Sequence, residues 1–198
     1  MSRTGLALVL LAYMSVPAFT QARGAHDTGA DAQNRHGIVI FGDGFVFLVS
    51  EPDGWDTDTG QQAKEYSVNA IFFPRSEASR SHHVNIRVRL NRKTTEDPDE
   101  DMTGDLKGYK KRYPSAKFAK LSEKHAQYKT SAGLFYTEND FYDYVAYLNP
   151  GAQCRFMFSV ALSKEKRPAT PGELAAFTHV LRSLHFVTDD VQGARPQQ

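Results

Sequence analysis

The sequence predicts an α+β fold in which one antiparallel β-sheet of about six or seven strands packs with two main helices. Short apolar segments separated by Gly, Pro, Asn and Asp fill most of the chain, a pattern typical of strands joined by hairpins. Helical periodicity is clear in two places, over residues 97–113 and 170–184. Hydrophobic residues make up 40% of the 198 residues, which is an ordinary globular balance.

The amino terminus has the parts of a secretory signal peptide. Arg3 precedes an apolar run over residues 5–14, which is too short for a bilayer-spanning helix. Small residues then mark a cleavage site after Ala22, with Ala18 as the alternative. We therefore expect residues 1–22 to be removed. The mature protein is then periplasmic or secreted, and no stable transmembrane span remains after cleavage.

The rest of the chain is expected to form one domain between two loose ends. Residues 23–36 and 188–198 are polar and aperiodic, so they cannot bury enough apolar surface to offset the entropy lost on ordering. The sequence thus predicts a disordered leader, a single α+β domain over residues 37–187 and a disordered tail.

The first half of this domain is expected to be β-structure. Two apolar runs, 38–41 and 45–49, flank a Gly-Asp-Gly turn and predict a hairpin, because glycine supplies the positive φ that tight turns require. Residues 66–73 predict a third strand. Residues 84–90 give the clearest alternation of the chain, with apolar side chains on one face and polar side chains on the other.

Two helices carry capping signals. Asp97 followed by Pro98 predicts a helix that begins here and ends at Tyr113 before a proline. Thr170 and Glu173 form a capping box at the start of the last helix. Between the helices we expect strands over residues 118–129, 132–137, 142–148 and 153–162.

Three of these features together resemble the PsbP-like family. They are the P-x-G-W turn that ends in Trp55, the helix before Tyr113, and the terminal helix that begins at Thr170 and runs into a Leu-His-Phe segment. The family has a sheet between helices, and it includes an extrinsic photosystem II subunit, a nuclear Ran-binding protein of the Mog type and secreted bacterial proteins of the DcrB type. The resemblance covers about residues 38–187 and implies a binding or assembly role. It assigns no functional residue, and the signal peptide argues against the nuclear role.

Composition and motifs exclude several functions. The chain has 24 Lys+Arg against 23 Asp+Glu, so it lacks the basic field of nucleic-acid binders. Cys154 is the single cysteine, which rules out an internal disulfide and CxxC sites, and its alternation with phenylalanines predicts a buried, inert thiol. We find none of the motifs GxGxxG, GxxxxGK[ST], HExxH or GxSxG. Neither an enzyme nor a cofactor is therefore expected.

Two surfaces are candidates for partner binding. The first is a basic patch made of Arg87, Arg89 and Arg92, together with Lys107, Lys110 and Lys111. It could bind an acidic partner or anionic headgroups, although a solvated face is the alternative. The second is an aromatic hairpin whose Tyr142 and Tyr144 share one face. It is either a contact surface or part of the core.

Other chemical groups favour structural roles. His82 and His83 point to opposite faces if extended, so they are poor joint metal ligands. The Asp-rich segment 56–60 lacks the later ligands of a calcium loop, and the acids of segment 96–101 suit a helix amino terminus. Ser183 and His185 could share a strand face, but no motif supplies the rest of a hydrolase site.

We therefore expect an exported, non-enzymatic protein of the bacterial cell envelope whose partner is an unknown envelope protein or a small ligand. One alternative is an envelope hydrolase or metal-dependent enzyme whose site is assembled only in three dimensions. Another is a ligand carrier with an aromatic-lined cavity.

Overall fold

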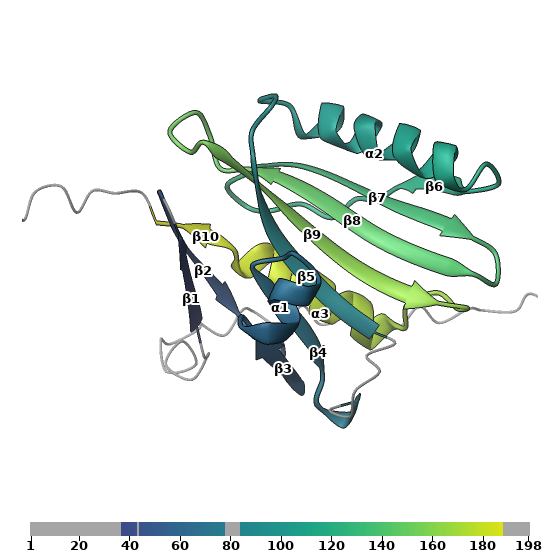
Figure 1. Cartoon of the computed structure of the whole chain (residues 1–198), viewed down its shortest axis with the longest axis horizontal. Helices are drawn as coiled ribbons and strands as arrows, with labels where there is room; N and C mark the ends of the chain where they lie inside the picture. Colours follow the sequence, from purple (N-terminus) through teal and green to yellow (C-terminus); the bar gives the residue numbers. More distant parts are fainter. Residues whose placement is uncertain (1–36, 43, 78–83, 188–198) are drawn as a thin grey trace, which may run out of the picture. The chain divides into compact units, whose positions relative to one another are not determined.

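The computed structural model describes residues 37–42, 44–77 and 84–187, which form two β-sheets and three α-helices (Figure 1). In chain order the elements are β1 (Gly37–Gly42), β2 (Phe45–Ser50), β3 (Trp55–Asp58), α1 (Gln61–Glu65), β4 (Ala70–Pro74), β5 (Val84–Arg92), α2 (Pro98–Arg112), β6 (Lys117–Lys120), β7 (Lys129–Thr137), β8 (Phe141–Asn149), β9 (Phe156–Glu165), α3 (Pro171–Ser183) and β10 (His185–Phe186). The predicted signal peptide, leader and tail lie outside the described residues. No helix among the described residues is both long and apolar enough to cross a bilayer.

The larger sheet has seven strands in the order β3-β4-β5-β9-β8-β7-β6, and every neighbouring pair is antiparallel. Strand β5 pairs with β9 along its whole length, from Val84 opposite Lys164 to Arg92 opposite Phe156. The α+β fold class with an antiparallel sheet is thus confirmed. The expectation of a single sheet is incomplete, because β1, β2 and β10 form a separate three-stranded sheet.

The smaller sheet contains the predicted hairpin. Strands β1 and β2 pair antiparallel with Gly42 opposite Phe45, and Gly44 has a φ of 76°, which suits the tight turn. Strand β10 pairs with the other side of β2, with Phe186 opposite Phe47. Phe47 is fully buried in the main core, so this sheet and the large sheet share one apolar interior.

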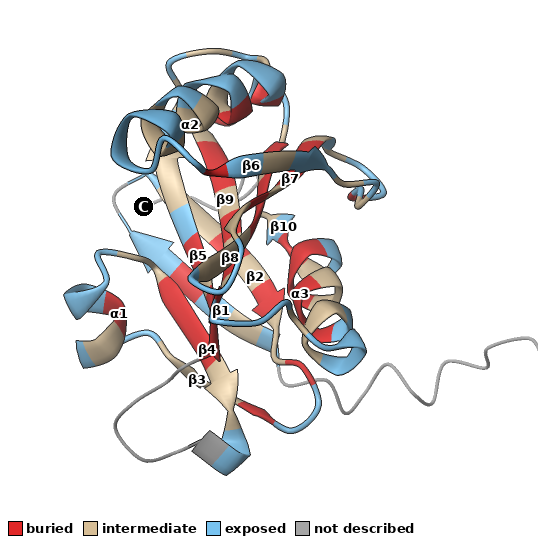
Figure 2. Cartoon of the chain, turned by 90° about the vertical axis from the view of Figure 1, so that its right-hand side faces the viewer, coloured by how far each residue is buried: buried red, intermediate tan, exposed pale blue. Residues whose placement is uncertain are grey.

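Helix α2 covers one face of the large sheet. Asp97 caps it as predicted, because its side chain accepts a hydrogen bond of 3.0 Å from the backbone N–H of Asp99. Met102 packs with Phe135 of β7 and Val145 of β8 in a small apolar cluster. Figure 2 shows α2 on one side of the sheet and α3 on the other.

Helix α3 packs over the opposite face, which forms the main core. Phe177, Val180 and Leu181 are buried there against the even-numbered side chains of β8 and β9. The predicted capping box is present: Thr170 Oγ1 accepts from the Glu173 N–H at 3.3 Å, and Glu173 Oε2 accepts from the Thr170 N–H at 2.6 Å. The two faces of one sheet are therefore covered by different helices.

Candidate functional site

A groove of about 270 Å³ lies between α2 and the sheet face formed by β5, β8 and β9. We call it the arginine groove, because three arginines line it. From the sheet side it is lined by Arg87, Arg89, Asn91, Val145, Tyr147, Ser159 and Ala161, from α2 by Asp105, Tyr109 and Arg112, and from the segment between α1 and β4 by Val68.

The groove exists because α2 does not cover the whole sheet face. The helix packs mainly on β7 and β8. In β5 the apolar Val84, Ile86 and Val88 face the main core, so the alternating Arg87 and Arg89 must face the α2 side. Arg87 is half-buried and Arg89 is exposed. The predicted alternation of β5 is thus confirmed, and it creates the polar wall of the groove.

The three arginines have few partners in the described part of the chain. An Nη atom of Arg87 donates to Ser163 Oγ, whereas its Nε atom is enclosed and has no acceptor. Arg89 donates to the backbone oxygen of Tyr66 at 3.2 Å. Arg112 lies over the ring of Tyr109, 5.2 Å from its centroid. None of the three pairs with a carboxylate among the described residues.

The carboxylates at the start of α2 are bound elsewhere. Glu96 pairs with Lys93 at 2.9 Å, and Asp97 pairs with Lys129 at 3.1 Å. Hydrogen bonds to Lys93 and Asn149 hold the pKa of Glu96 below its usual value. These acids cap and anchor the helix, as the sequence suggested. They do not line the arginine groove, so they do not offset its positive charge.

Two tyrosine–aspartate pairs hold α2 against β8. The hydroxyl of Tyr147 donates to Asp105 Oδ2, and that of Tyr109 donates to Asp143 Oδ2, both at 2.6 Å. Burial and the neighbouring carboxylates raise the pKa of both phenols far above their usual value. The phenols therefore stay protonated as donors, and the one carboxylate in the arginine groove, that of Asp105, is already hydrogen-bonded.

A second groove of about 450 Å³ adjoins the first, since Tyr109 and Arg112 line both. Its other lining residues are Tyr113, Asn139, Asp140, Phe141, Asp143, Glu165 and Lys166. Three carboxylates face two basic groups here, whereas three arginines face one carboxylate in the arginine groove. An anionic group is therefore attracted to the arginine groove, which β5 lines, rather than to the second groove.

The predicted basic patch is only partly assembled. Arg92 lies an odd number of residues from Arg89 on a regular strand, so its side chain belongs to the opposite face of the sheet. The sequence grouping of Arg92 with the other two arginines is corrected accordingly. Three lysines are exposed on α2 but do not line the groove: Lys107, Lys110 and Lys111. The basic residue of α2 that lines it is Arg112. Arg112 was not among the site residues that the sequence predicted.

The aromatic hairpin belongs to the core. Tyr144 is buried, and its hydroxyl accepts a hydrogen bond from the Ala169 N–H at 3.2 Å. Tyr142 stacks on Tyr136 with a centroid distance of 5.7 Å and packs against the main core. Between the two sequence alternatives, the structure favours a core role over a partner-contact surface.

The remaining candidates have structural roles where they are described. Asp58 accepts hydrogen bonds from the backbone N–H groups of Gly60 and Ala63, so it organises a turn. Ser183 accepts from the Ser50 N–H and donates to a backbone oxygen in its own helix. Cys154 is buried, and burial raises the pKa of its thiol. The described residues contain no group of three potential metal ligands, and the two histidines at 82 and 83 lie outside them.

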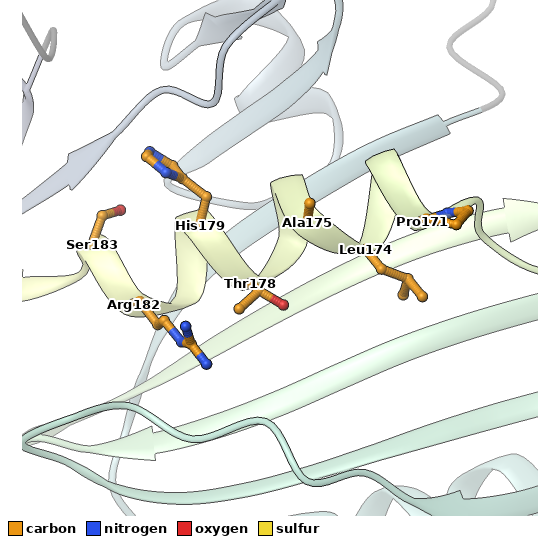
Figure 3. A pocket seen from close by; sticks show the side chains of 7 residues that line it. All are labelled: Pro171, Leu174, Ala175, Thr178, His179, Arg182 and Ser183. Atoms are coloured by element: carbon orange, nitrogen blue, oxygen red, sulfur yellow. The ribbon is translucent and has the colours of Figure 1, made fainter. Parts of the chain in front are cut away.

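A third hollow, about 570 Å³, lies along the outer surface of α3 (Figure 3). Every described residue that lines it comes from this one helix: Pro171, Leu174, Ala175, Thr178, His179, Arg182 and Ser183. Figure 3 shows His179 and Ser183 pointing to one side of the helix, and Thr178 and Arg182 to the other. These side chains diverge, so the described residues form no focused set of ligands there.

No family model matches the chain, and no curated protein matches it in sequence. Similar solved structures include a cyanobacterial PsbP (CyanoP) from Synechocystis, which is 12% identical, with 71% of this chain and 86% of that chain covered and a TM-score of 0.47. They also include a variant of the protein Mog1 (12% identity, 81% and 100% coverage, TM-score 0.49) and the Saccharomyces cerevisiae Ran-binding protein Mog1p (13% identity, 76% and 95% coverage, TM-score 0.46). These three structures are PsbP and Mog1 proteins, which are members of the PsbP-like family that the sequence resembles.

Proposed function

We propose that this protein is an exported, non-enzymatic binding protein of the bacterial cell envelope, and that its arginine groove binds an acidic segment of another protein. The observation that carries the proposal is the set of three guanidinium groups, from Arg87, Arg89 and Arg112, that line one groove without a carboxylate partner among the described residues. Export rests on the predicted signal peptide over residues 1–22.

Guanidinium chemistry favours this class of ligand. A guanidinium presents a planar fork of N–H donors that matches a carboxylate, and charge-assisted hydrogen bonds of this kind are stronger than neutral ones. The enclosed Nε of Arg87 has no acceptor among the described residues, so it costs free energy in the unbound protein. An incoming carboxylate that reached this group would remove that cost.

The form of the groove favours an extended segment over an enclosed small molecule. The arginine groove and the second groove meet at Tyr109 and Arg112, so one segment could follow the side of α2 through both. Its acidic residues would lie at the β5 end, where the arginines are. Complementary charge of this kind chiefly speeds association and selects against basic segments.

Binding is tested by fluorescence anisotropy with a labelled oligoglutamate peptide and the exported protein purified from cells that express the full chain. We expect the wild type to bind this peptide and not an oligolysine peptide. The double variant Arg87→Gln/Arg89→Gln should bind at least about tenfold more weakly, which corresponds to about 1.4 kcal/mol.

The matched control is Lys64→Gln/Lys124→Gln, which removes the same charge from exposed positions outside the groove. It should retain wild-type affinity. Equal weakening by both double variants, or no binding of oligoglutamate by the wild type, would contradict the proposal.

Export is tested independently by sequencing the amino terminus of the protein recovered from the periplasm or the medium. The expected sequence begins at Arg23. An intact Met1 terminus confined to the membrane fraction would contradict cleavage.

A further inference from the structure

Strand β1 carries the two most exposed large apolar side chains in the described residues. Phe41 is 78% exposed and Val39 is 55% exposed. They share one face of the strand and alternate with Ile38 and Ile40, which pack against the main core. Strand β1 is also the edge of its sheet in the order β1-β2-β10, so one row of its backbone N–H and C=O groups has no strand partner among the described residues (Figure 1).

This edge lacks the usual protection against pairing. Strand β1 has the sequence GIVIFG, without a charge or a proline. The edges of the large sheet are protected, since β6 carries Lys117 and Lys120 and β3 carries Asp56 and Asp58. An open, uncharged edge at β1 therefore contrasts with charged edges elsewhere in the same molecule.

We infer that β1 is a self-association edge on which a second copy of this chain adds its own β1. Two copies would pair antiparallel about a two-fold axis at Ile40. Directly opposite residues of an antiparallel pair lie on the same face, so Val39 would face the partner's Phe41 on both sides of the axis. The apolar side chains exposed in one copy thus cover those of the other.

A second copy fits this edge better than a charged partner segment. The strand has no charge that could attract or orient an acidic or basic segment, and two uncharged strands do not repel one another. A two-fold interface uses the same patch twice, and Val39 with Phe41 makes that patch self-complementary. None of these residues lines the arginine groove, so the inference is independent of the proposed binding site.

Sedimentation velocity of the exported protein over a range of concentrations tests the inference. We expect a concentration-dependent dimer that is lost in Phe41→Lys and in Val39→Lys. Tyr113→Lys, which places the same charge on an exposed aromatic position away from β1, should leave the dimer intact. A wild type that stays monomeric, or a dimer that persists in both β1 variants, overturns the inference. Thermal melts of all variants establish that they are folded.

The register is tested by disulfide formation between two variants. When Val39→Cys and Phe41→Cys are mixed under oxidising conditions, the mixed dimer should cross-link, and each variant alone should not. Cys154 is buried and does not interfere. Cross-linking of each variant with itself, without the mixed product, would overturn the register about Ile40.

Discussion

The hydroxyl of Tyr147 on β8 donates a hydrogen bond of 2.6 Å to Asp105 on α2, and both residues line the arginine groove. It joins the helix to the sheet strand on which the helix rests. Tyr109 makes an equivalent bond from the helix to Asp143 on the same strand. The wall of the groove that carries Arg112 is therefore fixed by two polar contacts as well as by the apolar cluster around Met102.

Removal of the Tyr147 hydroxyl should destabilise the protein. In Tyr147→Phe the carboxylate of Asp105 loses its short, partly buried donor, and we expect the free energy of unfolding to fall by about 1–3 kcal/mol. Tyr113→Phe, which changes an exposed ring on the same side of α2, should change it by less than about 0.5 kcal/mol. Urea denaturation measures both, and equal midpoints for the two variants would contradict the assignment.

The ion pair between Lys164 and Glu173 joins β9 to α3 in the interior. The Lys164 side chain is 3% exposed, and its Nζ lies 2.7 Å from Glu173 Oε1. Burial alone would raise the pKa of Glu173, but hydrogen bonds from Lys164 and the Thr170 backbone hold it below its usual value. Lys164→Met leaves this carboxylate without its main partner, so the free energy of unfolding should fall by about 3–5 kcal/mol.

The same substitution at an exposed ion pair provides the control. Lys117 pairs with Glu138 at 2.5 Å, and both side chains are largely in solvent. Lys117→Met should therefore change the free energy of unfolding far less than Lys164→Met does, because solvent screens the exposed pair. Guanidinium denaturation should separate the two variants clearly, and a Lys164→Met protein as stable as Lys117→Met would show that the interior pair contributes little.

His125 should make the protein less stable in mild acid. Its Nδ1 accepts from the backbone N–H groups of Gln127 and Tyr128, so its Nε2–H donates to the Leu184 oxygen at 3.0 Å. Burial, with a smaller contribution from nearby His185, lowers the pKa of His125 below its usual 6.5. The unfolded chain therefore binds this proton more readily than the folded protein.

The stability that the neutral ring contributes is fully present above about pH 6.5 and is lost as the pH falls through the folded pKa. The wild type should lose more free energy of unfolding between about pH 7.5 and pH 5 than His125→Gln does. His185→Gln removes only the smaller contribution to the shift, so its pH dependence should stay close to that of the wild type. Parallel pH profiles for the wild type and His125→Gln would contradict the prediction.

Two basic residues of α2 allow the effect of the groove on peptide binding to be distinguished from the effect of net charge. Arg112 lines the arginine groove, whereas Lys107 is exposed on the same helix outside it. We expect Arg112→Gln to weaken oligoglutamate binding several-fold and Lys107→Gln to leave it unchanged, since only the first removes a donor from the groove. If anisotropy titrations showed equal losses for both, net charge and not the groove would govern binding.

Local signals predicted the regular elements well. Asp97 with Pro98, and Thr170 with Glu173, are caps that act within one turn, and both helices begin where these residues indicate. The alternation of β5 predicted which face is buried, because side-chain direction along a strand depends only on position. The hairpin of β1 and β2 likewise depends on a turn between neighbouring segments.

Features that depend on distant contacts were missed. The predicted strand over residues 66–73 begins only at Ala70, after the short helix α1 and a turn. The predicted strand over residues 118–129 ends at Lys120, and the following segment is held by His125 against the end of α3. Strand β10 pairs with β2 far back in the sequence.

The candidate site, too, was predicted from the sequence only where local patterns determine it. Strand alternation put Arg87 and Arg89 on one polar face, but the grouping of Arg92 with them overlooked its even position. Arg112 joins the groove because α2 folds back over β8, and no local pattern signals that approach.

The most direct test of the arginine groove is nuclear magnetic resonance of the ¹⁵N-labelled protein during titration with the oligoglutamate peptide. We predict that the Nε–Hε signals of Arg87, Arg89 and Arg112 shift, together with the backbone amides of Asn91 and Ser159, which line the same groove. The signals of α3 and β1 should remain unchanged. Shifts confined to α3 or β1, or arginine Nε signals that do not move at a saturating peptide concentration, would contradict the account.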